Sequence, residues 1–289
     1  MRHRLQIALI FLAPVVLLGA LYLLGLTIPV PALGRDYVIR VVLPDANRPV
    51  GLPPILGPRD PSRPLVVIDA GHGGHDPGAV GVDFREKALA LGLARALRDE
   101  LLREGGVRVA LTRSDDRFLA LDERREIARR LGADLFLSIH ADSAGEKDEI
   151  TGASIYTLSA KASSEAAARV AARENSADRV NGVQLAGRSD AVANILVDLA
   201  QRRTSEQSAT FAGLIVREGD GVLKFHPDPR RSADFVVLRA PDVPSVLYEA
   251  GFISNPADAE RLTSPAGQQR FATVMAHAIR IYFARQAGV

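Results

Sequence analysis

From residue 64 onward, short apolar runs alternate with amphipathic helical periods, and this alternation limits the folds that the chain can adopt. Residues 65–68 are continuously apolar, as is typical of a strand buried on both faces. Residues 86–104 carry leucines at a spacing of four and stop at two glycines, which predicts an amphipathic helix. Such alternation predicts an α/β fold, a mostly parallel twisted sheet with helices on both faces. Further strands are expected at residues 107–111, 135–139, 154–158, 235–238 and 245–248, and further helices at 121–131 and 266–285.

Residues 161–217 interrupt this alternation with a long stretch of helical character. Ala162, Ala166 and Val170 share one helix face, and a polar segment that contains glycine follows at 175–190. Connections of this length inside a compact domain usually have a function of their own. We therefore expect an inserted helical segment with a role beyond joining two strands.

The first 33 residues contain two arginines and no acid, and residues 7–30 carry no charged side chain. About 20 apolar residues suffice to cross a bilayer as a helix, which disfavours a buried core helix here. The length of the run favours a membrane anchor through residues 5–30, whereas the small residues near Val30 and Ala32 would suit a signal peptidase. Both interpretations remain open, and both predict that the rest of the chain is exported.

Proline and glycine are frequent in residues 34–63, which predicts an extended linker before a folded domain at 64–289. The formal net charge is +2, and Arg2 and Arg4 account for it, so the rest of the chain is formally neutral. A neutral body gives no support to nucleic acid as a partner. The absence of cysteine from the sequence excludes a disulfide scaffold, a thiolate zinc site and a cysteine nucleophile.

Histidine and glutamate residues stand where the predicted strands end. His72, His140 and Glu249 each follow a predicted strand, and Glu86 begins the first helix on the same edge. Because open α/β sheets bind ligands beyond the carboxyl ends of their strands, these four side chains can converge. Two histidines and one carboxylate with an open fourth position form a ligand set for catalytic zinc. The second carboxylate, outside the metal shell, could then accept a proton from water.

Other catalytic or cofactor-binding motifs are either absent from the sequence or incomplete in it. The sequence has no His-Glu-x-x-His motif, no Gly-x-Ser-x-Gly motif and no P-loop. Gly71, His72 and Gly73 after a strand are similar to the start of a dinucleotide-binding fingerprint. However, Asp76 replaces its third glycine, and the helix at Glu86 starts too late to bind a pyrophosphate.

Five segments of the sequence are VIDAGHGG at 67–74, EK at 86–87, LTR at 111–113, SIHAD at 138–142 and EAGFISN at 249–255. Together they resemble the zinc-dependent N-acetylmuramoyl-L-alanine amidases of bacterial cell walls, and the similarity covers residues 64–285 in order. The resemblance implies that His72, Glu86 and His140 bind one zinc ion per chain and that Glu249 is the catalytic carboxylate. It also implies hydrolysis of the amide between the lactyl group of N-acetylmuramic acid and L-alanine of the peptidoglycan stem peptide, during wall remodelling and daughter-cell separation in the periplasm.

The segment at 161–217 resembles the regulatory segment of the division amidases, in which a helix covers the zinc cleft until an activator removes it. This resemblance implies that Glu174 fills the open position of the zinc, against the alternative that it is a solvated acid at a helix end. Arg239 either contacts the anionic substrate or pairs with an acid. The apolar face of Val192, Ile195, Leu196 and Leu199 would either pack on the body of the domain or bind a periplasmic activator by helix-in-groove recognition.

Two other functions remain open at this stage. One is a wall-binding module or activator without catalysis, although retention of all four chemical residues argues against it. The other is a zinc peptidase that cuts the stem peptide itself, which only the family resemblance disfavours. We expect peptidoglycan as the substrate, a periplasmic protein activator as the partner, and a monomeric chain.

Overall fold

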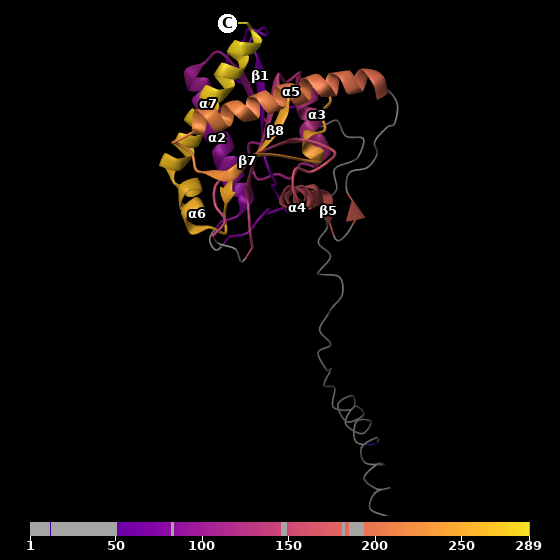
Figure 1. Cartoon of the computed structure of the whole chain (residues 1–289), viewed down its shortest axis with the longest axis vertical. Coiled ribbons are helices and arrows are strands. Elements are labelled where there is room, and N and C mark those ends of the chain that lie inside the picture. The colour runs from indigo at the N-terminus through magenta and orange to yellow at the C-terminus, as the bar shows by residue number, and fades with distance from the viewer. Residues whose placement is uncertain are drawn as a thin grey trace, which may run out of the picture. The chain divides into compact units, whose positions relative to one another are not determined.

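The computed structural model describes residues 12, 51–81, 84–145, 149–180, 183–184 and 194–288, and it describes only the backbone at 179–180, 183–184 and 194–201. From Val50 onward the chain forms one compact unit (Figure 1). Except for Leu12, the predicted anchor or signal peptide at 1–33 lies outside the described residues, as does the linker up to residue 50. Among the helices that the structure describes, none has both the length and the apolar character that a bilayer span requires.

The core of this unit is a six-stranded sheet with the order β2-β1-β3-β8-β4-β7. Neighbouring strands run parallel except β4 and β8, which are antiparallel. The predicted α/β fold with a mostly parallel sheet is therefore confirmed. Every residue of β1 and β3 is buried, as their continuous apolar runs predicted. The strands are β1 (Leu65–Ala70), β2 (Arg108–Leu111), β3 (Leu135–Asp142), β4 (Ala153–Leu158), β7 (Phe225–Ala233) and β8 (Ser245–Phe252).

Helices cover both faces of the sheet, and alternate strand residues enter two separate hydrophobic clusters. Ile68 and Ile139 pack on the face covered by α2 (Glu86–Glu104), α5 (Asn194–Gly219) and α7 (Pro265–Gln286). Phe136 and Leu247 pack on the opposite face, against α3 (Leu121–Leu131) and α4 (Glu165–Glu174). Because side chains alternate along a strand, His140 and Glu249 lie on the face of α3 and α4. Helices α2, α3 and α7 confirm the predicted ranges, whereas α6 (Pro256–Thr263) was not predicted.

One predicted strand is wrong. Residues 235–238 form a short 3₁₀ helix, η2 (Val236–Leu238), whose apolar side chains pack into the cluster on the α3 and α4 face. The strand position beside β4 belongs instead to β7, a polar segment that contains Pro227 and Pro229. Since β7 is an edge strand, it tolerates proline and lacks the apolar pattern of a central strand.

The predicted helical segment at 161–217 has two parts. The first is α4, followed by the short helix η1 (Asn175–Asp178) and the paired strands β5 (Arg179–Val180) and β6 (Val183–Gln184). The second is α5, which buries Phe211 and Ile215 in the core and connects the parallel strands β4 and β7. In Figure 1, α5 is the long helix that runs beside α7, while α4 and β5 lie together elsewhere on the domain. Val192 and the side chains of Ile195, Leu196 and Leu199 lie outside the described part of the chain.

The last part of the predicted linker is attached to the sheet. Leu56 and Val109 of β2 exchange backbone hydrogen bonds, with N···O distances of 2.8 and 2.9 Å. This isolated bridge holds the chain against the edge strand before β1 begins.

Candidate metal and catalytic site

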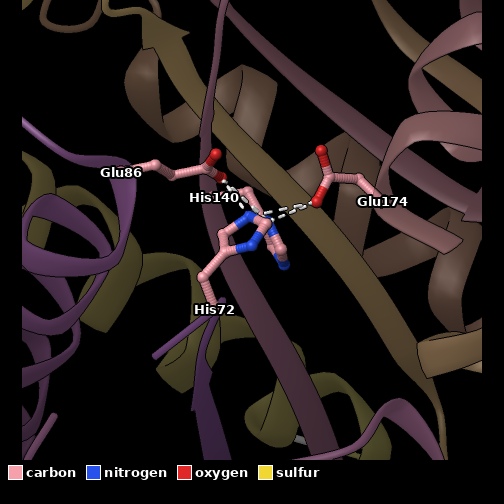
Figure 2. Close-up of side chains that lie close together, drawn as sticks. All are labelled: His72, Glu86, His140 and Glu174. Atoms are coloured by element: carbon pink, nitrogen blue, oxygen red, sulfur yellow. Dashed lines mark hydrogen bonds and ion pairs between the residues drawn. The ribbon is translucent and has the colours of Figure 1, made fainter. Parts of the chain in front are cut away.

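Four buried side chains converge at the carboxyl edge of the sheet: His72 after β1, Glu86 at the start of α2, His140 in β3 and Glu174 at the end of α4. His72 Nε2 lies 2.9 Å from Glu86 Oε1 and 3.2 Å from Glu174 Oε2. His140 Nδ1 lies 3.0 Å from the same two oxygens and 3.2 Å from His72 Nε2. Figure 2 shows the two carboxylates on opposite sides of the imidazole pair.

These distances and donor types fit a bound divalent cation. A tetrahedral site with bonds of about 2.0–2.1 Å places its ligand atoms about 3.3 Å apart, close to the observed spacing. Glu174 Oε2 has no hydrogen-bond partner despite its approach to both imidazole nitrogens. A carboxylate oxygen and two nitrogen lone pairs would face each other in this way around a shared cation. The group could therefore hold a metal ion.

Backbone N–H groups of a loop and of β3 fix the carboxylate of Glu86. The backbone N–H of Ala79 donates to Glu86 Oε2 at 2.8 Å, and the N–H of Ala141 donates to Oε1 at 3.0 Å. The carbonyl of Ala79 accepts the N–H of Glu86, so the same loop also satisfies the start of α2. Glu86 is thus a fixed acceptor inside the site rather than an exposed charge at a helix start.

Asp76 fixes the orientation of His72. Its Oδ2 lies 2.7 Å from His72 Nδ1, and the backbone N–H of Gly78 donates to its Oδ1 at 3.0 Å. A carboxylate at Nδ1 favours the tautomer that carries its proton there, which leaves Nε2 free to bind a metal. Asp76 was not predicted as a site residue, since the sequence shows only that it replaces the third glycine of a dinucleotide fingerprint.

Two buried arginines hold the loop that carries His72, whose φ is +58°. Arg124 donates to the carbonyl of His72 at 2.7 Å, and Arg113 donates to the carbonyl of Gly71 at 2.6 Å. Gly71 itself is required because an added Cβ would lie 2.4 Å from the ring of His140. Arg113 lies in a segment that carried the family resemblance, but the pattern did not say what it binds.

Glu249 lies beside the metal group but is not part of it. It pairs in register with His140 of β3, is only 2% exposed, and has no hydrogen bond to either carboxyl oxygen. Burial, and then the carboxylates of Asp142 and Glu174, raise the pKa of Glu249 well above its ordinary value. A carboxyl group in such surroundings holds its proton to a higher pH than an ordinary glutamate.

The charges of the group favour cation binding. Burial alone would lower the pKa of His140, but Glu174 and Glu86 outweigh it and raise the pKa to about 10. Burial alone would raise the pKa of Glu86, but His72 and His140 lower it to about 2. The two carboxylates thus favour positive charge at the imidazole nitrogens, and a divalent cation would supply that charge in place of protons. Metal binding to such a group releases protons.

The segment around Glu174 is held at several points. The guanidinium of Arg173 pairs with Asp142, which lies two residues after His140. The side chain of Asn175 donates to the carbonyl of Asp234 at 2.7 Å and accepts the N–H of Val236 at 2.9 Å. A cavity beside the segment is lined by His72, Asp76, Glu86 and Glu174, together with His75, Pro77, Gly78, Ala79, Arg173, Ser176 and Ala177.

Arg239 makes a two-point ion pair with Asp234, at 3.0 Å from Nε and 2.5 Å from a terminal guanidinium nitrogen. Its side chain is 44% exposed, and it is not one of the four residues of the metal group. Pairing with an acid was one of the two predictions for Arg239. Contact with the substrate stays a prediction.

Comparison with known proteins agrees with this geometry. The family described as N-acetylmuramoyl-L-alanine amidase matches residues 66–280. N-acetylmuramoyl-L-alanine amidase AmiA of Escherichia coli (strain K12) is 41% identical over 221 residues, 76% of this chain and 76% of that protein. The solved structure of amidase AmiC2 of Nostoc punctiforme covers 77% of this chain and 98% of its own, with a TM-score of 0.54 and 28% identity. The CwlD amidase from Clostridioides difficile, solved in complex with the GerS lipoprotein, covers 76% and 98%, with a TM-score of 0.53 and 25% identity.

Proposed function

The chain belongs to the N-acetylmuramoyl-L-alanine amidase family, and from this premise we propose a zinc-dependent hydrolase of the lactyl–L-alanine amide of peptidoglycan that acts in daughter-cell separation. Peptidoglycan amidase activity follows from the family. The observation that supports zinc is the buried group of His72, Glu86, His140 and Glu174, whose ligand atoms all lie within 4.8 Å of one another.

In this proposal His72, Glu86 and His140 hold the zinc ion, and Glu249 is the catalytic carboxylate. Zinc would supply Lewis acidity, which activates water and polarises the amide carbonyl. Glu249, with its raised pKa, would accept the proton of the attacking water and pass it to the leaving amine. Arg113 and Arg124 would keep His72 in place during the reaction through their bonds to its loop.

Digestion of purified sacculi tests this function against the alternative of a stem-peptide peptidase. The 289-residue chain, loaded with zinc, should release intact stem peptides that carry a free L-alanine amine. The chain after chelation should release none. Mass analysis of the products distinguishes the two reactions, because a peptidase would leave L-alanine attached to muramic acid. Peptides truncated at their amino end would contradict the proposal.

The contact of Asp76 with His72 leads to a prediction about metal affinity. Asp76→Asn removes the carboxylate that fixes the tautomer of His72, so we expect a zinc affinity lower by about 10- to 100-fold. Competition titration with a zinc chelator measures this directly. Asp99→Asn is the matched control, because Asp99 is exposed and pairs with Arg98 on α2, outside the metal group. Equal affinities in both variants would contradict the role assigned to Asp76.

We further propose that α4 and η1 form a lid that inhibits the resting enzyme, with Glu174 in the fourth position of the zinc. Glu174 is 3% exposed and lies against both imidazoles, so water would have to displace it. The lid is pinned to the domain by Arg173 on Asp142 and by Asn175 on the segment at 234–236. Asp178 adds a third point, since it accepts the N–H of Leu121 at the start of α3.

Glu174→Ala should raise the basal rate on sacculi without any partner. If loss of the zinc–carboxylate contact weakens the covered state by only about 1.4 kcal/mol, the population of a rare open form rises tenfold. Dye release from labelled wall, at equal zinc occupancy, measures the rate. The control is Glu165→Ala, at the exposed opposite end of the same helix. If both variants match the wild type, Glu174 does not block the site.

The proposal also includes a protein activator and a periplasmic location for the enzyme. A periplasmic protein that binds only the uncovered form would shift the equilibrium by its differential affinity. The CwlD amidase in complex with the GerS lipoprotein supports the idea of a protein partner for an enzyme of this kind. Since the substrate lies outside the cytoplasmic membrane, the residues at 1–33 would export or anchor a domain that works in the periplasm. We propose that this domain acts as a monomer.

A further inference from the structure

Buried polar atoms without a hydrogen-bond partner gather at one place in the described part of the chain. They are Ser154 Oγ, Glu174 Oε2 and both carboxyl oxygens of Glu249. The approach of Glu174 to the two imidazoles accounts for its oxygen. Buried groups of this kind are rare in native proteins, and each needs an explanation. The unpaired polar atoms of Ser154 and Glu249 therefore need an explanation of their own.

Ser154 and Glu249 lie directly opposite each other on neighbouring strands. Ser154 of β4 pairs with Glu249 of β8 in antiparallel register, and each of these residues is only 2% exposed. Directly opposed residues point to the same face of a sheet, with Cβ atoms about 4.5–5.5 Å apart. On the other side of Glu249, the register places His140 of β3. Serine, glutamate and histidine thus form a row that leads to the metal group.

The chemistry of the two orphaned groups is complementary. An ionised carboxylate only accepts hydrogen bonds, and a serine hydroxyl has one proton to donate. Rotation about the Cα–Cβ bond of Ser154 moves its hydroxyl among three staggered positions, while the strand pairing stays intact. Apolar residues of α4 cover this face of the sheet, including Ala167, Val170 and Ala171. Departure of the proposed lid would give both side chains room to move.

We propose that the hydroxyl of Ser154 positions the carboxylate of Glu249 by donating a hydrogen bond to it when the lid is open. The inference rests on the proposed function, in which Glu249 is the catalytic carboxylate. Ser154 is a positioning residue, because it touches neither the zinc nor the scissile amide and no bond to it forms or breaks. Its hydrogen bond orients Glu249 toward the attacking water.

The test is a double-mutant cycle between Ser154→Ala and Glu249→Gln in the full-length chain with Glu174→Ala, so that the lid does not mask the effect. We expect Ser154→Ala to lower kcat about 10-fold, the effect of losing one hydrogen bond to a charged group, with KM and zinc content unchanged. Ser154→Thr keeps the hydroxyl and should restore most of kcat. In chains that carry Glu249→Gln, Ser154→Ala should cause no further loss, because its effect passes through Glu249.

The control is Ser245→Ala, since Ser245 is a buried serine at the start of β8 whose hydroxyl donates to the carbonyl of Val243 instead. Chemical unfolding of the same four variants measures the contact even if the chain does not hydrolyse peptidoglycan. Additive effects in both kinetics and unfolding would overturn the inference. A second result would also overturn the inference: both Ser154→Ala and Ser154→Thr lose kcat together with Tm or zinc. In that case Ser154 contributes to packing and does not position Glu249. Equal kcat for Glu249→Gln and its parent would instead reject the proposed function.

Discussion

Glu249→Gln should lower kcat by about 10²- to 10⁴-fold, the usual contribution of general acid–base catalysis, while the zinc content stays at one ion per chain. The amide keeps the shape of the side chain but cannot accept a proton. Glu249 is a neighbour of the metal group in register with His140 and does not belong to the group, so its replacement should leave the zinc bound. Steady-state hydrolysis of sacculi and metal analysis of the same sample measure both quantities.

The pH dependence of the rate is a second test of the role of Glu249. The ionised carboxylate is the active form, and burial with the neighbouring carboxylates raises the pKa of Glu249. The rate should therefore fall as the pH drops, and this fall should begin above the range of an ordinary glutamate. Glu249→Gln should lose that step. If Glu249→Gln instead loses its metal and Glu86→Gln retains it, the roles of the two glutamates are exchanged.

His140→Ala should remove both the zinc and the activity, and His72→Ala should do the same. Each variant loses one of the two proposed imidazole ligands. Two carboxylates and one imidazole remain in the covered form and only two protein ligands in the open form, and sites with two ligands hold zinc poorly. Each also leaves Glu86 and Glu174 buried together with one imidazole partner fewer, since both carboxylates lie within 3.2 Å of His72 Nε2 and 3.0 Å of His140 Nδ1. Mass spectrometry under native conditions measures the metal content.

His75→Ala is the matched control for the histidine variants. His75 lines the cavity at the site, but it is exposed, and its ring packs at a tilt against Phe118 rather than joining the metal group. We expect His75→Ala to keep its zinc and most of its activity. Full metal content in either His72→Ala or His140→Ala would defeat the assignment of the ligands.

Some elements were predictable because their signals are local. The apolar runs of β1 and β3 reflect burial on both faces, and the spacing of leucines in α2 reflects a single buried stripe. By contrast, β7 carries two prolines and few apolar residues, since it pairs on only one side. The apolar residues at 235–238 then looked like the missing strand, although they fill the core as a 3₁₀ helix.

The sequence by itself determined that His72, His140, Glu86 and Glu249 would stand at one edge of a parallel sheet, because strand ends are set by local hydrophobic pattern and strand direction. That local pattern does not determine the orientation of each side chain. Asp76 reaches His72 through a loop, and the hydrogen bonds of that loop have no periodic signature.

Only the tertiary structure decided that Glu174 points into the metal group. A glutamate at the end of an amphipathic helix reads equally well as a solvated acid. Its burial results from contacts between distant segments, such as Asn175 with the chain at 234–236 and Asp178 with Leu121. The pairing of Ser154 with Glu249 likewise depends on the register of β4 against β8. Such register follows from the packing of the whole sheet, which no local stretch of sequence encodes.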